Sequence, residues 1–281
     1  MNQLAANLTP EDHQALVHAY RALEHPGLVA RVSNVLGIPL SATLKLLPRP
    51  WHAAVASAAE TAVTKALEVA ISSLGDTPSR AAGSSSHQML CMATGAVGGF
   101  FGLPALLVEL PVTTTIMLRA IADVARREGE DLADLDARLA CVHVLAFGGR
   151  SGEDTYTELG YYEVRAALAL HFSVVSHHIA ARGVDGQLPA TVNLIRSIAA
   201  RFGVVISEKA AAQMVPLLGA AAGALVNRAF MDHYQDVATG HFTVRRLERT
   251  YSGEAIEAAY RAIATEQEQP RVGASAARAN P

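Results

Sequence analysis

A stretch of 20 residues without a formally charged side chain, from Met89 to Val108, limits the folds open to this chain. It ends at Glu109, which stands between Pro104 and Pro111 in an otherwise apolar segment. A run of this length reaches the lower limit for a membrane-spanning helix. Several glycines and Pro104 weaken a continuous span. Three alternatives stay open: a true span, a re-entrant or interfacial hairpin, and an ordinary buried hairpin.

Small side chains supply much of the apolar composition. Hydrophobic residues make up 51% of the chain, but aromatic residues only 5%. Gly95 and Gly99, and likewise Gly219 and Gly223, are four residues apart, which lets helices approach closely in lipid or in a soluble core. Apolar residues recur at helical spacing, and no segment shows sustained strand alternation. We therefore expect an all-α fold, a multi-helix bundle with glycine-rich apolar helical hairpins.

Start and stop signals predict where the helices lie. Thr9 is expected to cap a first helix, because Pro10 and two acidic residues follow it. This helix should end near Glu24, before a His-Pro-Gly sequence. Further helices are expected at about 50–74, 111–128, 155–182, 188–201 and 254–264. Another helix should run from a cap at Asp134 to about residue 147, and a short one should begin at Ser207. A long helix is expected from Pro216 to about Arg249.

A change in composition suggests a division of the chain. The sequence GDTPSRAAGSSS, around residues 76–86, is typical of a flexible joint. It separates a predicted N-terminal helical arm, 1–75, from a predicted helical body, 87–264. The tail, 265–281, is too polar and too small in its side chains to fold alone, so we expect it to be disordered.

Charge and cysteine content narrow the class of protein. The net charge is −3, from 23 basic and 26 acidic residues, which provides no electrostatic surface for nucleic acid. Cys91 and Cys141 are far apart and show no metal-binding spacing, so we expect reduced, buried thiols. The N-terminus shows no signal-peptide pattern. These features favour a cytoplasmic protein, in the simplest case one peripheral to the inner membrane.

The charged residues inside the apolar segments need partners, because an unpaired buried carboxylate is costly. Arg119 precedes Asp123 by one helical turn, so we expect these two side chains to pair locally. Pro111 biases the residue before it away from helix. Glu109 is therefore expected at a kink, where its carboxylate accepts hydrogen bonds from the first amides of the following helix.

An alternative use for these acids is a metal site. Asp232 and Asp236 are four residues apart on the last long helix, and His233 can converge with Asp236 on one ligand. Together with Glu109 and Asp123 they form the candidate ligand set of a metal-dependent hydrolase. No di-iron or zinc-protease motif is present, and we expect no metal or other cofactor. A structural hydrogen-bond network of Asn227, Asp232 and Asp236 is the simpler interpretation, and His143 is interpreted as a core histidine.

The end of the same helix is basic. Arg245, Arg246 and Arg249 follow an uncharged, glycine-containing stretch at 210–226. Such arginines can contact anionic headgroups while the apolar part packs or inserts. The alternative is that they stabilise the negative end of their own helix dipole.

Several long phrases of the sequence resemble the EcsC family of bacterial proteins. The resemblance covers about residues 85–262 and rests on GAVGGFFGLPALLVELPVTTTIMLRAIADVARREGEDL, CVHVLAFGGRS, GYYEVRAALA and RFGVVISEKAAAQMVPLLGAAAGALVNRAFMDHYQDVATGHFTVRRLE. The family is named for a gene that neighbours an ABC transporter pair. The resemblance brings no catalytic residues with it and implies only an association with transport or the envelope.

The sequence thus supports two function hypotheses. The first is a non-catalytic accessory protein that contacts the inner-membrane surface or a membrane transporter through its glycine-rich hairpins. The second is the metal-dependent hydrolase, acting on peptides or lipids through carboxylates of the central helices. Substrate, oligomeric state and any insertion into lipid are not encoded in a recognisable pattern.

Overall fold

The computed structural model describes residues 8–24, 27–36, 49–75, 84–101, 103–149, 160–182, 188–213 and 219–268. Within these ranges the regular elements are helices and no strand occurs, which confirms the all-α multi-helix bundle. The helices are α1 (Pro10–Glu24), α2 (Leu28–Leu36), α4 (Arg49–Ser73), α5 (Ser84–Phe101), α6 (Leu103–Arg127), α7 (Leu135–His143), α8 (Tyr161–Arg182), α9 (Pro189–Gln213), α10 (Gly219–Tyr251) and α11 (Gly253–Glu268), with a 3-10 turn, η2 (Val144–Ala146).

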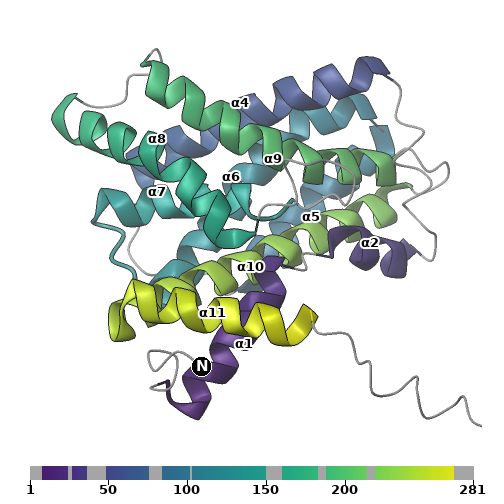
Figure 1. The fold of residues 1–281 in the computed structure, drawn as a ribbon. Helices are drawn as coiled ribbons and strands as arrows, with labels where there is room; N and C mark the ends of the chain where they lie inside the picture. The colour runs from purple at the N-terminus through teal and green to yellow at the C-terminus, as the bar shows by residue number, and fades with distance from the viewer. Residues whose placement is uncertain are drawn as a thin grey trace, which may run out of the picture.

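Helix α10 is the axis of the bundle. Its 33 residues correspond to a length of about 50 Å at the usual helical rise. Helices α1, α2, α5, α6 and α11 pack against it, while α4 packs against α6 and α9. In Figure 1, α1 and α11 lie on one side of α10, and α9 and α4 lie on the other. Segments from both ends of the chain therefore meet on one long helix.

The closest helix contact joins α5 to α10 at a glycine. A β-carbon at Gly95 would lie 2.5 Å from the carbonyl oxygen of Gly223 and 2.6 Å from the β-carbon of Asn227. Neither distance leaves room for a methyl group, so only glycine permits this approach of the two backbones. The small-residue spacing at Gly95 and Gly223 thus serves close packing between α5 and α10.

Local capping signals predicted several helix ends. The Thr9 hydroxyl accepts a hydrogen bond from the Asp12 amide at 3.1 Å, which confirms it as the cap of α1. Asp134 accepts from the Asp136 amide at 3.2 Å and caps α7, as expected. Gly129, at φ 82°, ends α6 in the left-handed region that favours glycine. Each of these signals depends only on residues within one turn.

Three predicted helix boundaries are wrong. The helix expected from about residue 155 begins only at Tyr161, after the non-helical Gly160. The other two concern α6 and α9. Helix α6 begins at Leu103 and continues through Pro111, although proline removes one amide hydrogen bond. Helix α9 is continuous from Pro189 to Gln213 and does not stop near Arg201. Both helices are packed against several neighbours. This tertiary packing outweighs the local signals for a helix start or end.

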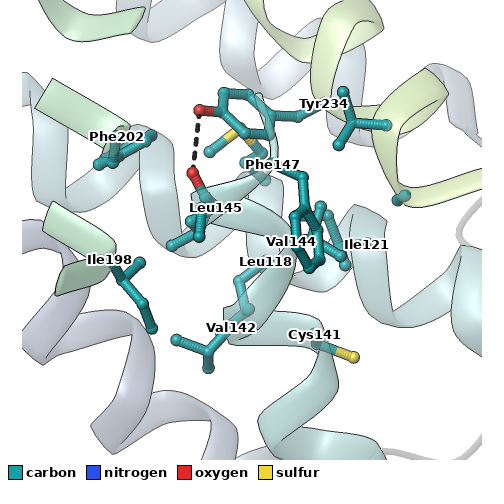
Figure 2. Close-up of a cluster of buried hydrophobic side chains, with 14 of the residues drawn as sticks. Leu118, Ile121, Cys141, Val142, Val144, Leu145, Phe147, Ile198, Phe202 and Tyr234 are labelled. Carbon is teal, nitrogen blue, oxygen red and sulfur yellow. Dashed lines mark hydrogen bonds between the residues drawn. The ribbon is translucent and has the colours of Figure 1, made fainter. Parts of the chain in front are cut away.

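The core is aliphatic, with a few aromatic side chains. Figure 2 shows one part of it, where the η2 turn inserts Leu145 between Phe202 of α9 and Tyr234 of α10. The Tyr234 hydroxyl donates to the Leu145 carbonyl oxygen at 3.5 Å. Cys91 and Cys141 are buried and unpaired by disulfide, and burial raises the pKa of each thiol to about 12. Both are protonated, packed side chains, as expected.

The predicted arm does not stand apart from the body. Helices α1 and α2, both from the range 1–75, pack on α10, and α4 of the same range packs on α6, α7 and α9. The division into domains stays a prediction. Most of the predicted joint (76–86) and of the predicted tail (265–281) lies outside the described residues.

One described helical segment, Pro189–Ala212 of α9, is long and apolar enough to cross a membrane. This is weak evidence for a span, because core helices of soluble proteins pass the same test. Helix α9 packs against α4 and α8, and 39% of the segment is buried inside the bundle. Its Lys209 is completely buried, which is consistent with a place in the protein core.

Candidate functional site

The acid between the prolines pairs with a lysine from another helix. Glu109 lies on the inner face of α6, and its Oε1 accepts from Lys209 Nζ of α9 at 2.9 Å. The same oxygen accepts from Asn227 Nδ2 of α10 at 2.6 Å and from the Thr113 hydroxyl at 3.1 Å. The Lys209 and Glu109 side chains are only 0% and 6% exposed. The expected helix cap at Glu109 is therefore wrong, because α6 runs through this position.

The hydrogen bonds around this ion pair connect four helices. Asn227 Nδ2 also donates to the Cys91 carbonyl oxygen of α5 at 2.8 Å, next to the glycine contact between α5 and α10. The Lys209 ammonium lies 5.0 Å from the Phe230 ring centroid, a cation–π contact. Glu109 Oε2 and Asn227 Oδ1 are buried and have no hydrogen-bond partner among the described residues. The network has a structural role: it neutralises the Glu109 carboxylate and holds α5, α6, α9 and α10 in their positions relative to one another.

The second predicted pair forms with a different partner. Asp123 accepts from Arg126 Nη1 at 2.9 Å and faces His87 Nδ1 of α5 at 3.6 Å. Arg119 is exposed and forms no ion pair with any described residue, so the expected Arg119–Asp123 pair is wrong. An acidic residue that precedes a basic one on a helix has the more favourable orientation in the helix dipole. Arg126 also donates to the Leu74 carbonyl oxygen at 3.0 Å, which holds it in place.

The predicted metal ligands on α10 point to different neighbours. Asp232 accepts from Gln88 of α5 at 2.8 Å, and Asp236 pairs with Arg31 of α2. His233 Nε2 lies 2.9 Å from the Gly148 carbonyl oxygen, and burial lowers the pKa of His233 to about 4. The neutral ring therefore donates this hydrogen bond. Asn227 bonds to Glu109 rather than to either aspartate.

These contacts separate the five candidate ligands. Within the ranges that the structure describes, no three His, Cys, Asp or Glu side chains are grouped so that they can hold a metal ion. Successive residues of a helix are rotated by about 100°, so α10 directs Asp232 and His233 toward different elements. Convergence of the carboxylates, on which the hydrolase hypothesis depends, does not occur.

The three arginines near the end of α10 lie in a network of acids. Arg245 donates to Glu130 through Nε at 2.8 Å and Nη2 at 3.0 Å. Arg249 also pairs with Glu130, and Arg246 pairs with Glu128 at 2.9 Å and with Asp12 of α1 at 3.4 Å. Burial raises the pKa of Glu130, but the hydrogen bonds and charges of Arg245 and Arg249 outweigh this effect and lower it.

The turn after α6 explains why these acids are available. Gly129 reverses the chain and thereby presents Glu128 and Glu130 to α10. The positive charges of the arginines are largely compensated within the protein. A role for them at anionic headgroups stays a prediction, and the structure supports neither that role nor a purely helix-dipole one.

Large apolar side chains are exposed on three parts of the described structure: the paired helices α5 and α6, α8, and α10. Among the described residues, the large hydrophobic side chains that are exposed are Met89, Leu90, Val108, Val112, Leu170, Val174 and Leu225. The first four belong to α5 and α6, which pack against each other. We call α5 and α6 together the α5–α6 hairpin. Leu170 and Val174 lie on α8, and Leu225 lies on α10.

The functional residue that sequence reasoning missed is Lys209. A signal was present: the chain has lysine only at positions 45, 65 and 209, and Lys209 stands directly before the uncharged stretch that begins at 210. A lone lysine beside an apolar segment requires a buried acid as partner or an exposed position. Glu109 was the corresponding lone acid on the other apolar segment.

Comparison with known proteins gives one family. The family model described as "EcsC protein family" matches residues 14–247, which is most of the chain and includes α1, α2 and α4. No curated protein and no solved structure matches.

Proposed function

The chain belongs to the EcsC protein family, and from this premise we propose that it is a non-catalytic accessory protein that contacts the inner-membrane surface through its α5–α6 hairpin. The surface contacted is the lipid headgroup and upper acyl region of the cytoplasmic leaflet. A link to transport or to envelope processes is part of the proposal and follows from the family resemblance. The hydrolase alternative has no corresponding observation in its favour.

One observation carries this proposal: the part of the hairpin between residues 84 and 118 buries its single charge and exposes apolar side chains. Between residues 84 and 118 the only formal charge is Glu109, which is buried against Lys209. The outer face of this segment thus presents no formal charge, while Met89, Leu90, Val108 and Val112 are exposed. Transfer of each such side chain from water to the acyl boundary gains about 1 kcal/mol or more. Several together suffice for reversible interfacial binding.

The first charge beyond this segment suits the headgroup level. Arg119 follows on α6, is exposed, and has no acidic partner among the described residues. Arg119 differs in this respect from the three arginines near the end of α10, which pair with acids. An unpaired arginine beside an apolar surface extends its guanidinium toward phosphates and gains about 1 kcal/mol at an anionic membrane.

Vesicle flotation tests the proposal. Val108→Asp places a charge on α6 at an exposed apolar position of the hairpin, where the native side chain is 79% exposed. We expect at least a tenfold lower partition coefficient on vesicles of phosphatidylcholine and phosphatidylglycerol. The matched control is Leu170→Asp on α8, where the native side chain is 72% exposed. This control should float like the wild type, and Arg119→Ala should show a smaller, salt-dependent loss.

Two results contradict the proposal. One is a wild-type protein that does not bind these vesicles at low salt. The other is an equal loss for Val108→Asp and Leu170→Asp, which would show that no particular surface is responsible. Circular dichroism of each variant establishes that the fold is retained, since both positions are on the surface.

A further inference from the structure

A groove of about 670 Å³ lies between α7, α8 and α10, away from the α5–α6 hairpin. This volume is in the range of sites that bind small molecules. His143 of α7 and His241 of α10 line it, together with the guanidinium groups of Arg165 and Arg245 and the hydroxyl of Ser173 on α8. Polar groups from three helices thus face one space.

The ring of His241 has a fixed tautomer. Arg165 Nη1 donates to the Tyr161 hydroxyl oxygen at 3.2 Å, and this hydroxyl lies 2.8 Å from His241 Nδ1. Burial raises the pKa of Tyr161, so the hydroxyl keeps its hydrogen. It donates that hydrogen to Nδ1, and the proton of the neutral imidazole is then on Nε2.

This Nε2–H group is a donor without an acceptor. His241 is 1% exposed, and its Nε2 is buried with no hydrogen-bond partner among the described residues. Burial lowers the pKa of His241 well below its usual value, so the ring is neutral. A buried donor without a partner is costly and needs an explanation, such as a ligand that supplies the acceptor.

His143 repeats this pattern beside His241. Its ring centroid lies 6.2 Å from that of His241 and 5.1 Å from that of Phe172. It is 7% exposed, and its Nε2 is likewise buried without a partner in the described part of the chain. Burial, with the charges of Arg165 and Arg245, lowers its pKa to about 3. Two neutral imidazoles therefore lie next to each other at the groove.

Two guanidinium groups of the groove lining keep unused N–H donors beside the histidines. Arg165 binds Glu248 with two hydrogen bonds, and Arg245 binds Glu130 with two, so each guanidinium retains N–H groups for a further acceptor. Burial lowers the pKa of both histidines, and the positive charges of Arg165 and Arg245 lower it further. The acids Asp134 and Asp136 also line the groove, but both are exposed, so solvent screens them.

We infer that this groove binds the phosphate group of a small molecule. A phosphate monoester offers three terminal oxygens in a tetrahedral arrangement, which suits several donors that approach from α8 and α10. His241 Nε2–H and the free N–H groups of Arg165 and Arg245 supply these donors. The rest of the ligand lies along Ala169 and Phe172 of the groove wall. This inference does not rest on the proposed membrane contact.

Calorimetric titration with inorganic phosphate and with glycerol 3-phosphate, without lipid, tests the inference. Ser173→Asp adds a negative charge to the groove wall and should weaken binding at least tenfold. The matched control, Ser57→Asp, makes the same change at an exposed position of α4 and should bind as the wild type does. His143→Phe replaces an unpaired polar ring by an apolar one of similar shape, so it should fold and also bind more weakly.

A second readout identifies the contact and the source of the phosphate. In ¹⁵N-labelled protein, the Nε2 signal of His241 should shift on addition of glycerol 3-phosphate, and it should not shift in Ser173→Asp. Flotation on phosphatidylcholine vesicles with and without phosphatidic acid distinguishes a lipid headgroup from a free ligand. Loss of the phosphatidic acid dependence in Ser173→Asp identifies the lipid, and an unchanged dependence identifies the soluble ester. No heat and no His241 shift with either soluble probe overturns the inference.

Discussion

The Lys209–Glu109 pair and the arginine network at the end of α10 both join basic to acidic side chains, but they differ in how far these side chains are exposed to solvent. Lys209 and Glu109 are almost completely removed from water, and one acidic oxygen receives three donors. Arg246 is 38% exposed and divides its bonds between Glu128 and Asp12. For the buried pair, the Glu109 carboxylate is tolerated in the core only because it has Lys209 as its cationic partner. In the arginine network, solvent and a second acid can replace any one bond.

This difference separates two ways in which α10 is held. A buried pair must offset a large desolvation cost, so it contributes little net stability while both partners are present. Removal of one partner exposes that cost in full. An exposed pair contributes little to the free energy of unfolding, and removal of one partner therefore costs little. The half of α10 next to α5, α6 and α9 therefore contains one buried pair whose disruption is costly, and the other half contains several pairs, of which those of Arg246 are partly exposed.

The largest effect is expected from Lys209→Met, which leaves Glu109 buried without its cation. We expect a loss of about 3–5 kcal/mol in the free energy of unfolding, measured by urea denaturation. The double variant with Glu109→Leu should recover most of this loss, because no uncompensated charge remains. A loss below about 1 kcal/mol for the single variant would show that the pair is not buried in solution.

The neighbouring residue on α9 gives an intermediate effect with a defined pH dependence. Glu208 has no ion-pair or hydrogen-bond partner among the described residues, and burial raises its pKa from 4.5 to about 8. Between these values the folded protein holds a proton that the unfolded chain releases. The free energy of unfolding due to this group therefore falls as the pH rises through this window.

Glu208→Gln removes this dependence, because the amide does not titrate. At pH 8 the variant should be more stable than the wild type by about 2 kcal/mol, less than the full pKa difference implies, since the side chain keeps some solvent contact. At pH 5 the two proteins should differ little. Denaturant titrations at several pH values measure this, and a constant difference would contradict a titration of Glu208.

The smallest effect is expected from Arg246→Ala at the surface. We expect a loss of about 0.5–1 kcal/mol in the free energy of unfolding at low ionic strength, and a smaller loss in 1 M salt. The Lys209→Met loss should change little with salt, because solvent ions do not reach the buried pair. If added salt reduced the stability loss of Lys209→Met and of Arg246→Ala equally, the two pairs would not differ in their exposure to solvent.

Local chemistry made the helices and several of their ends predictable. The caps at Thr9 and Asp134 were predicted from the two or three residues around each helix start, and both caps are present in the structure. The path of α6 through Pro111 was not predictable in this way. The neighbouring helices that keep this segment helical come from distant parts of the sequence.

The candidate site was predictable only in part, and for the same reason. Glu109 was recognisable from the sequence as a residue that needs a partner, because it is a lone acid in an apolar segment. Its partner is 100 residues away in the sequence, whereas pairing rules for helices reach only three or four residues. The same rules misassigned the partner of Asp123, since three arginines lie three or four residues from it. The hydrogen bond between Tyr161 and His241 gave no sequence signal, because neither residue belongs to a recognisable motif.

The glycine contact between α5 and α10 restricts how the hairpin can move. If α5 slid by one turn along α10, the side chain of Cys91 would reach the place of Gly95, where not even a β-carbon fits. A slide in this direction is thus blocked sterically. A slide of one turn the other way would bring Gly99 to the same place, where no β-carbon interferes, so the contact leaves the hairpin a single direction of movement along α10.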